Sequence, residues 1–72
     1  MSGQPLTMYV IYNKPSDYPN DYVVREWLND VPGSVVGTAP TLELARALVP
    51  PTQDYCMPRD INDDRKIVET WL

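Results

Sequence analysis

Apolar and β-branched residues gather in two early segments that predict β-strands. Residues 6–12, LTMYVIY, are mostly β-branched or aromatic. Residues 21–28, DYVVREWL, have the same character and precede a run of turn-forming residues. Because strands that follow one another along the chain are usually neighbours, these segments predict an antiparallel hairpin. Residues 13–20 then form its loop.

A turn and a third strand are expected next. Pro32 and Gly33 suit the two central positions of a type II turn, because proline fixes φ and glycine accepts a positive φ. The turn would reverse the chain within residues 29–34, NDVPGS, and lead into a short strand at 35–39, VVGTA. The first three strands would therefore be consecutive.

Residues 42–49 carry the pattern of an amphipathic helix. Thr41 is a good N-cap, and Glu43 lies in the first turn, where a negative charge is favoured. Pro50 and Pro51 end the helix. Apolar positions recur at helical spacing and predict a face that packs on a sheet; they are Leu42, Leu44, Ala45, Leu48 and Val49.

The segment after the helix has no regular period. Residues 52–64, TQDYCMPRDINDD, are rich in proline, asparagine and aspartate, which favours an irregular connection over a helix or strand. Connections of this length are uncommon in small domains and are often functional. Residues 66–72, KIVETWL, then predict a final strand.

Two distant segments have similar sequences, VVREWL at 23–28 and IVETWL at 67–72. Alternation along a strand places Val23, Arg25 and Trp27 on one face of the first, and Ile67, Glu69 and Trp71 on one face of the second. If the two strands are neighbours, an Arg25–Glu69 cross-strand pair becomes possible. The similarity is a hint about strand order and not a repeat.

These segments predict a single α+β domain over residues 1–72, with residues 1–5 flexible. Its order is β-β-β-α-β, and one helix covers one face of a small mixed sheet of about four strands. The crossover through the helix would most often be right-handed and leave the last strand parallel to an earlier one. The other face of the sheet would be only partly covered.

Cysteine and histidine content limits how such a small domain is stabilised. A core of this size supplies only about 3–5 kcal/mol unless a disulfide, a metal or a second subunit contributes. The chain has one cysteine, Cys56, and no histidine, so an internal disulfide and a structural zinc site are both excluded. Association with another subunit is the remaining source of stability.

An EF-hand reading of the acidic run at 60–64 also fails. Asp60, Asn62 and Asp64 fit the first three ligand positions of a calcium loop. Arg65 stands where the loop needs glycine, and Trp71 stands where it needs glutamate. A solvated turn is therefore expected, and no metal or other cofactor is predicted.

Charge and hydropathy exclude two classes of partner. Six basic against ten acidic residues give a net charge of −4, and no basic stripe is present, so binding to nucleic acid is not expected. No apolar run approaches the roughly 18 residues of a membrane span, and the start of the chain does not resemble a signal peptide. With a single thiol, these features predict a cytoplasmic protein.

The residues of common active sites are missing. Nucleophilic catalysis of the Ser–His or Cys–His kind needs a histidine, which the chain lacks. Its three glycines, at 3, 33 and 37, cannot form a phosphate-binding loop. Cys56 is expected to be a partly buried structural side chain, although a regulatory thiol is not excluded. An enzyme is not predicted.

Aromatic residues are the strongest functional signal, because tyrosine and tryptophan are enriched at interfaces. The leading hypothesis is a protein-interaction or accessory module, with a homodimer joined through the open sheet face or a strand edge as one form. Packing of Tyr18 or Tyr22 over the sheet edge is the plainer alternative. The candidate contact residues are Tyr18, Tyr22, Trp27, Tyr55, Arg59 and Trp71.

A second hypothesis is a small-ligand-binding protein or minor enzyme. Its pocket would lie between the 13–20 and 52–64 loops and would use Tyr18, Tyr55, Arg59 and Asp60. A concave site with buried charge would favour ligand binding, whereas a flat aromatic patch would favour the interaction module.

Three segments together resemble a family of small uncharacterised bacterial proteins. They are YVVREWL at 22–28, TLELARALVP at 41–50 and DDRKIVETWL at 63–72. The likeness spans residues 8–72, and none of the three segments is a catalytic motif. The resemblance implies a shared small fold and supplies no activity, ligand or functional residue.

Overall fold

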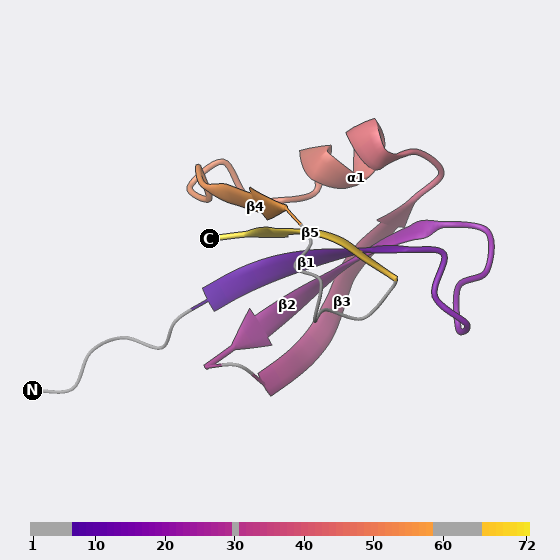
Figure 1. The fold of residues 1–72 in the computed structure, drawn as a ribbon, viewed down its shortest axis with the longest axis horizontal. Helices are drawn as coiled ribbons and strands as arrows, with labels where there is room; N and C mark the ends of the chain where they lie inside the picture. Colours follow the sequence, from indigo (N-terminus) through magenta and orange to yellow (C-terminus); the bar gives the residue numbers. More distant parts are fainter. Residues whose placement is uncertain (1–6, 30, 59–65) are drawn as a thin grey trace, which may run out of the picture.

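The strand pattern of the sequence yields five strands and one short helix in the computed structural model, which describes residues 7–29, 31–58 and 66–72 (Figure 1). The strands form one antiparallel sheet in the order β3-β2-β1-β5-β4. The elements are β1 (Thr7–Asn13), β2 (Tyr22–Leu28), β3 (Val31–Ala39), α1 (Leu42–Ala47), β4 (Cys56–Pro58) and β5 (Ile67–Trp71).

The predicted antiparallel hairpin of the first two strands is confirmed, but the mixed sheet of about four strands is wrong. β5 pairs antiparallel with β1, and β4 pairs antiparallel with β5. The additional strand β4 lies inside the segment that was expected to be irregular. Because the chain runs through β4 before it reaches β5, it reverses direction once more, and no parallel crossover forms.

The turn between β2 and β3 lies three residues earlier than predicted. Leu28 pairs directly with Val31, and Asn29 has a φ of 50°, a conformation that asparagine tolerates well. Pro32 and Gly33 belong to β3 instead. Proline is acceptable there because β3 is an edge strand and does not need every N–H for pairing.

Gly33 is required for close packing and not for a turn. In β3, Gly33 and Ser34 together lie opposite Glu26, which makes a β-bulge. A Cβ atom at Gly33 would lie 2.9 Å from the backbone oxygen of Glu26. No described glycine has a positive φ, so the predicted type II turn at Pro32–Gly33 is wrong.

Helix α1 starts as predicted and ends two residues earlier. The Thr41 side chain accepts a hydrogen bond from the backbone N–H of Leu44 at 3.2 Å, which confirms the N-cap. Ala45 and Val49 are buried against the sheet, whereas Leu44 is 52% exposed. The apolar face of the helix is thus narrower than the sequence indicated.

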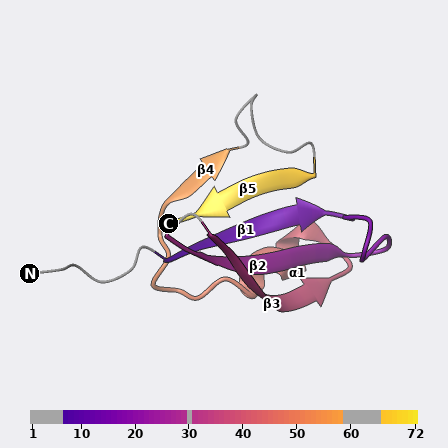
Figure 2. The same ribbon diagram turned by 90° about the horizontal axis from the view of Figure 1, so that it is seen from below.

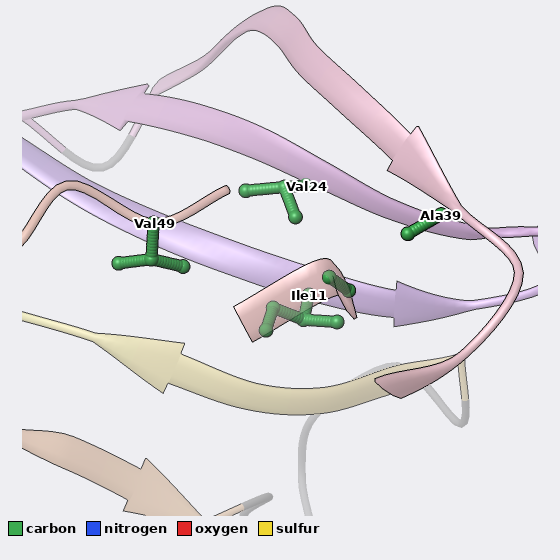
Figure 3. Close-up of a cluster of buried hydrophobic side chains, with 5 residues drawn as sticks. Ile11, Val24, Ala39 and Val49 are labelled. Atoms are coloured by element: carbon green, nitrogen blue, oxygen red, sulfur yellow. The ribbon is translucent and has the colours of Figure 1, made fainter. Parts of the chain in front are cut away.

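The core lies between α1 and one face of the sheet. Its buried side chains come from β1, β2, β3, the helix and the residues just after it (Figure 3). Ile11 on the central strand β1 and Val24 on β2 are fully buried and pair across the two strands. The cluster comprises Ile11, Val24, Ala39, Ala45 and Val49.

Strand β4 is short but is extended by backbone pairing. The N–H of Leu72 donates to the oxygen of Tyr55 at 2.8 Å, beyond the last regular pair of β4 and β5. The final strand is confirmed at Ile67–Trp71, with one extra residue, Val68, relative to β1. In the described part of the chain no helix has the length and apolar character of a membrane span.

Candidate functional site

The two tryptophans lie on opposite faces of the sheet. Trp27 pairs with Met8 and Trp71 pairs with Tyr9, and neighbouring residues of a strand point to opposite faces. Trp71 packs against the core cluster beneath α1. Trp27 therefore belongs to the face that α1 does not cover, the side seen in Figure 2 with α1 behind the strands.

A hydrogen bond fixes Trp27 on this face, opposite α1. Its Nε1–H donates to the hydroxyl of Tyr12 at 3.1 Å. Tyr12 lies opposite Val23, four pairs further along the β1–β2 ladder, so on this face the bond spans the pair formed by Val10 and Arg25. Val10 and Val23 are only 4% and 2% exposed, although both lie on the side away from the helix.

Beside the two aromatic rings lies a pocket of about 160 Å³. Two strands, the β1–β2 loop and the start of β3 contribute to its wall. Aromatic, proline and valine side chains make up most of the wall, and two residues are charged. We call it the aromatic pocket; it is lined by Tyr12, Pro15, Asp17, Val23, Arg25, Trp27 and Pro32.

Arg25 is held in the pocket by the backbone of β3. Its Nη1 donates to the oxygen of Gly33 at 2.6 Å, next to the bulge. Among the described residues, no carboxylate lies within ion-pair distance of its guanidinium group. Asp17, on the same pocket wall, is exposed, and no ion pair joins it to Arg25.

The β1–β2 loop is ordered by its own backbone and supplies Pro15 and Asp17. Lys14 has a φ of 50°, and its N–H donates to the oxygen of Asp21 at 3.0 Å. The N–H of Tyr18 donates to the oxygen of Pro15 at 2.9 Å, which closes a tight turn. The sequence YNKPSDYPNDY is therefore both a hairpin connector and one wall of the pocket.

A buried carboxylate lies on the opposite face, beneath α1. Glu69 is 5% exposed and receives two hydrogen bonds from Arg46, each at 2.9 Å, from Nε and Nη2. Trp71 Nε1–H donates to the same carboxylate at 2.8 Å. Arg46 and, less strongly, Trp71 hold the pKa of Glu69 below its ordinary value, although burial acts in the opposite direction.

Cys56 lies beside this ion pair and is not activated by it. Burial, followed by the negative charge of Glu69, raises the pKa of the Cys56 thiol. A raised pKa reduces the thiolate fraction at neutral pH, so the site does not favour nucleophilic chemistry at this thiol. Glu69, Arg46 and Trp71, which we call the Glu69 cluster, instead join α1 to β5.

Of the predicted contact residues that the structure describes, Trp27 alone lines the aromatic pocket. Tyr18 and Tyr55 are exposed and do not line it, and Tyr55 is 60% exposed. Tyr22 and Trp71 pack against the core cluster. The remaining candidates, Arg59 and Asp60, lie outside the described residues, as does the acidic run at 60–64.

Sequence reasoning missed the pocket because its wall depends on strand register. The expected Arg25–Glu69 pair is wrong, since β1 separates β2 from β5 and the two side chains lie on opposite faces. Alternation along β2 did identify Val23, Arg25 and Trp27 as one face, and this is confirmed. Tyr12 would have been found by pairing 6–12 with 21–28 in an explicit register.

Comparison with known proteins gives no match to a family model, a curated protein or a solved structure. The resemblance to small bacterial proteins therefore stays a prediction. In the described ranges, no group of three or more histidine, cysteine, aspartate or glutamate side chains is arranged to hold a metal ion.

Proposed function

We propose that the protein is a cytoplasmic protein-interaction module that receives a side chain of its partner in the aromatic pocket. The observation that carries this proposal is the pocket itself, formed around Trp27 and Tyr12 on the face of the sheet opposite α1. Tryptophan, tyrosine and arginine are the residues most often found at the energetic centre of protein interfaces. Trp27 and Arg25 both line the aromatic pocket.

The size of the pocket favours a side chain over a free small molecule. Pockets for small ligands usually have volumes of roughly 300–1,000 Å³. A pocket of about 160 Å³ is smaller and suits one anchoring side chain. For the second hypothesis, ligand binding between the 13–20 and 52–64 loops, the first loop supplies Pro15 and Asp17 to the pocket, whereas the described residues 52–58 of the second loop do not line it.

The strand edges are weaker candidates for the interface. β3 contains Pro32 and departs from regular pairing at two places, and both features hinder pairing with a further strand. β4 spans only three residues. Self-association remains a second form of the proposal, because Leu28 and Val31 are exposed apolar side chains at the end of the β2–β3 hairpin.

Selection from a random-sequence peptide library, followed by affinity measurement on purified protein, tests the proposal. Peptides enriched on the wild-type protein are expected to bind Trp27→Leu at least about tenfold more weakly, because leucine keeps an apolar cover but removes the indole from the pocket wall. Tyr55→Leu is the matched control, since this aromatic ring is exposed outside the pocket.

Two results would contradict the proposal. The first is a selection that enriches no peptide. The second is a set of enriched peptides that bind Trp27→Leu as tightly as wild type. Light scattering over a concentration series identifies self-association separately, as a rise in mass that Trp27→Leu or Leu28→Ser reverses.

A further inference from the structure

The walls of the aromatic pocket restrict what kind of partner segment fits it. Tyr12 and Trp27 present flat rings, and Pro15 from the β1–β2 loop and Pro32 at the start of β3 add rigid apolar walls. The indole N–H of Trp27 is already bonded to Tyr12, so the rings are fixed before any partner arrives. A preformed aromatic and proline-lined surface favours rigid apolar groups over long flexible ones.

Proline-rich segments match these walls. Such segments adopt the extended polyproline II conformation before binding, so they lose little conformational entropy when they dock on an aromatic-lined surface. A prolyl ring is compact, apolar and rigid, and a pocket of about 160 Å³ accommodates it beside Trp27.

Arg25 supplies the hydrogen bonds that such a segment requires. The carbonyl groups of a polyproline II backbone have no internal partners and need donors. Arg25 is anchored through Nη1 to the oxygen of Gly33, and its guanidinium group carries further N–H donors in fixed geometry. Because no described carboxylate pairs with it, these donors are not held by an ion pair within the described structure.

The charges around the pocket indicate which residue lies next to the prolines of the partner peptide. Asp17 is exposed on the pocket wall, and the whole chain carries a net charge of −4. Arg25 alone would attract an acidic segment, but Asp17 and the net charge both oppose it. A basic residue beside the prolines would form an ion pair with Asp17. The guanidinium group of Arg25 would then donate hydrogen bonds to backbone carbonyl groups of the peptide.

Building on the proposed function, we propose that the partner segment is a proline-rich peptide in the polyproline II conformation with a basic residue beside its prolines. A prolyl ring lies against Trp27 and Tyr12, the Arg25 guanidinium donates to a peptide carbonyl, and Asp17 accepts from the basic side chain.

Titration of ¹⁵N-labelled protein with synthetic peptides tests this partner class. The probe is an eight-residue peptide with two prolines separated by two residues and one flanking arginine. The indole N–H signals of Trp27 and Trp71 report the two faces of the sheet separately. Binding is expected to shift the Trp27 indole signal and the Gly33 amide signal, while the Trp71 indole signal stays in place.

Three altered reagents complete the experiment. Replacing both prolines of the peptide by alanine is expected to weaken binding by about tenfold or more. Asp17→Asn is expected to weaken binding of the arginine peptide by about two- to fivefold, as for an exposed charge pair. Asp54→Asn removes the same charge from an exposed position outside the pocket and should leave the affinity unchanged.

Each outcome decides between the two proposals. If library-selected peptides shift the Trp27 signal and the proline peptide does not, the partner class is wrong and the interaction module stands. The partner class is also wrong if the alanine peptide binds equally well or if an acidic apolar peptide binds more tightly. If neither set of peptides shifts the Trp27 signal, both proposals fail.

Discussion

Glu69 shows at the scale of one residue how a buried charge is made acceptable. Its carboxylate receives both hydrogen bonds of a bidentate Arg46 interaction and a third from Trp71. Among the described residues, no buried side-chain nitrogen or oxygen lacks a hydrogen-bond partner. Removing the charge therefore costs more than in an exposed ion pair, because the three hydrogen bonds to a buried carboxylate are weakened or lost.

Replacing Glu69 tests this account through the pH dependence of stability. The pKa of Glu69 is lowered in the folded protein from its ordinary value of 4.5, so the unfolded chain takes up this proton first as the pH falls. The stabilisation is complete above pH 4.5 and is lost progressively as the pH falls through the folded-state pKa. Urea denaturation at several pH values measures it.

Glu69→Gln is expected to lower the free energy of unfolding at pH 7 by about 1–3 kcal/mol. The variant should also lose less stability than wild type between pH 5 and pH 3, since glutamine does not titrate. A wild-type curve and a variant curve that stay parallel over this range would show that the Glu69 cluster does not carry the acid sensitivity.

Two glycines of β3 provide a matched test of close packing. A Cβ at Gly33 would meet the backbone oxygen of Glu26 at 2.9 Å, and the backbone cannot move without disturbing the bulge. A Cβ at Gly37 would meet Cδ1 of Leu48 at 3.0 Å, which is the flexible end of a side chain.

Gly33→Ala should therefore destabilise the protein by about 1–3 kcal/mol, and Gly37→Ala by clearly less. Thermal denaturation of both variants makes the comparison. Equal effects of the two substitutions would mean that β3 shifts as freely at the bulge as it does beneath α1.

At the scale of an element, α1 depends on its ends and its contacts. A helix of six residues is too short to be stable by itself in water, so tertiary contacts must hold it. Ala45 contributes a fully buried methyl group, and Arg46 joins the last turn to β5. Thr41 contributes the N-cap by accepting a hydrogen bond from Leu44.

Thr41→Ala is expected to lower the free energy of unfolding by about 1 kcal/mol, because the N–H of Leu44 loses its acceptor. Thr41→Ser keeps the hydroxyl and should retain most of the stability. Chemical denaturation of the two variants measures the difference. If the serine variant lost as much stability as the alanine variant, the methyl group of Thr41 and not its hydroxyl would be responsible.

At the scale of the whole molecule, the two faces of the sheet differ in what packs on them. α1 and the Glu69 cluster complete the core on one face, and the aromatic pocket lies on the other. β1 lies at the centre, with neighbours on both sides, while β3 and β4 are the edges. Residues of the core and residues of the aromatic pocket therefore alternate along the same strands.

Native-state hydrogen exchange should reflect this arrangement. Backbone amides of β1, above all Val10 and Ile11, are expected to exchange most slowly, because both edges of the strand are paired and both residues are buried. Amides of α1 and β4 should exchange orders of magnitude faster, as short peripheral elements do. Slowest exchange in β4 or α1 would contradict the central position of β1.

Local pattern was enough to place most elements along the chain. β-branched and aromatic runs identified β1, β2 and β5, and helix propensity with Thr41 identified α1. These features are local because propensity and capping act over a few residues. Only their boundaries differed, as for α1, which ends at Ala47 and not at residue 49.

By itself, the sequence determined the segments of β1, β2 and β5, the second half of β3, the capped helix and the shared face of Val23, Arg25 and Trp27. Tertiary structure alone decided the strand order, the strand β4, the bulge at Gly33 and the assembly of the pocket. The physical reason is that β4 has no periodicity of its own and exists because β5 offers it a pairing edge. Register between strands likewise placed Tyr12 beside Trp27, which no local pattern specifies.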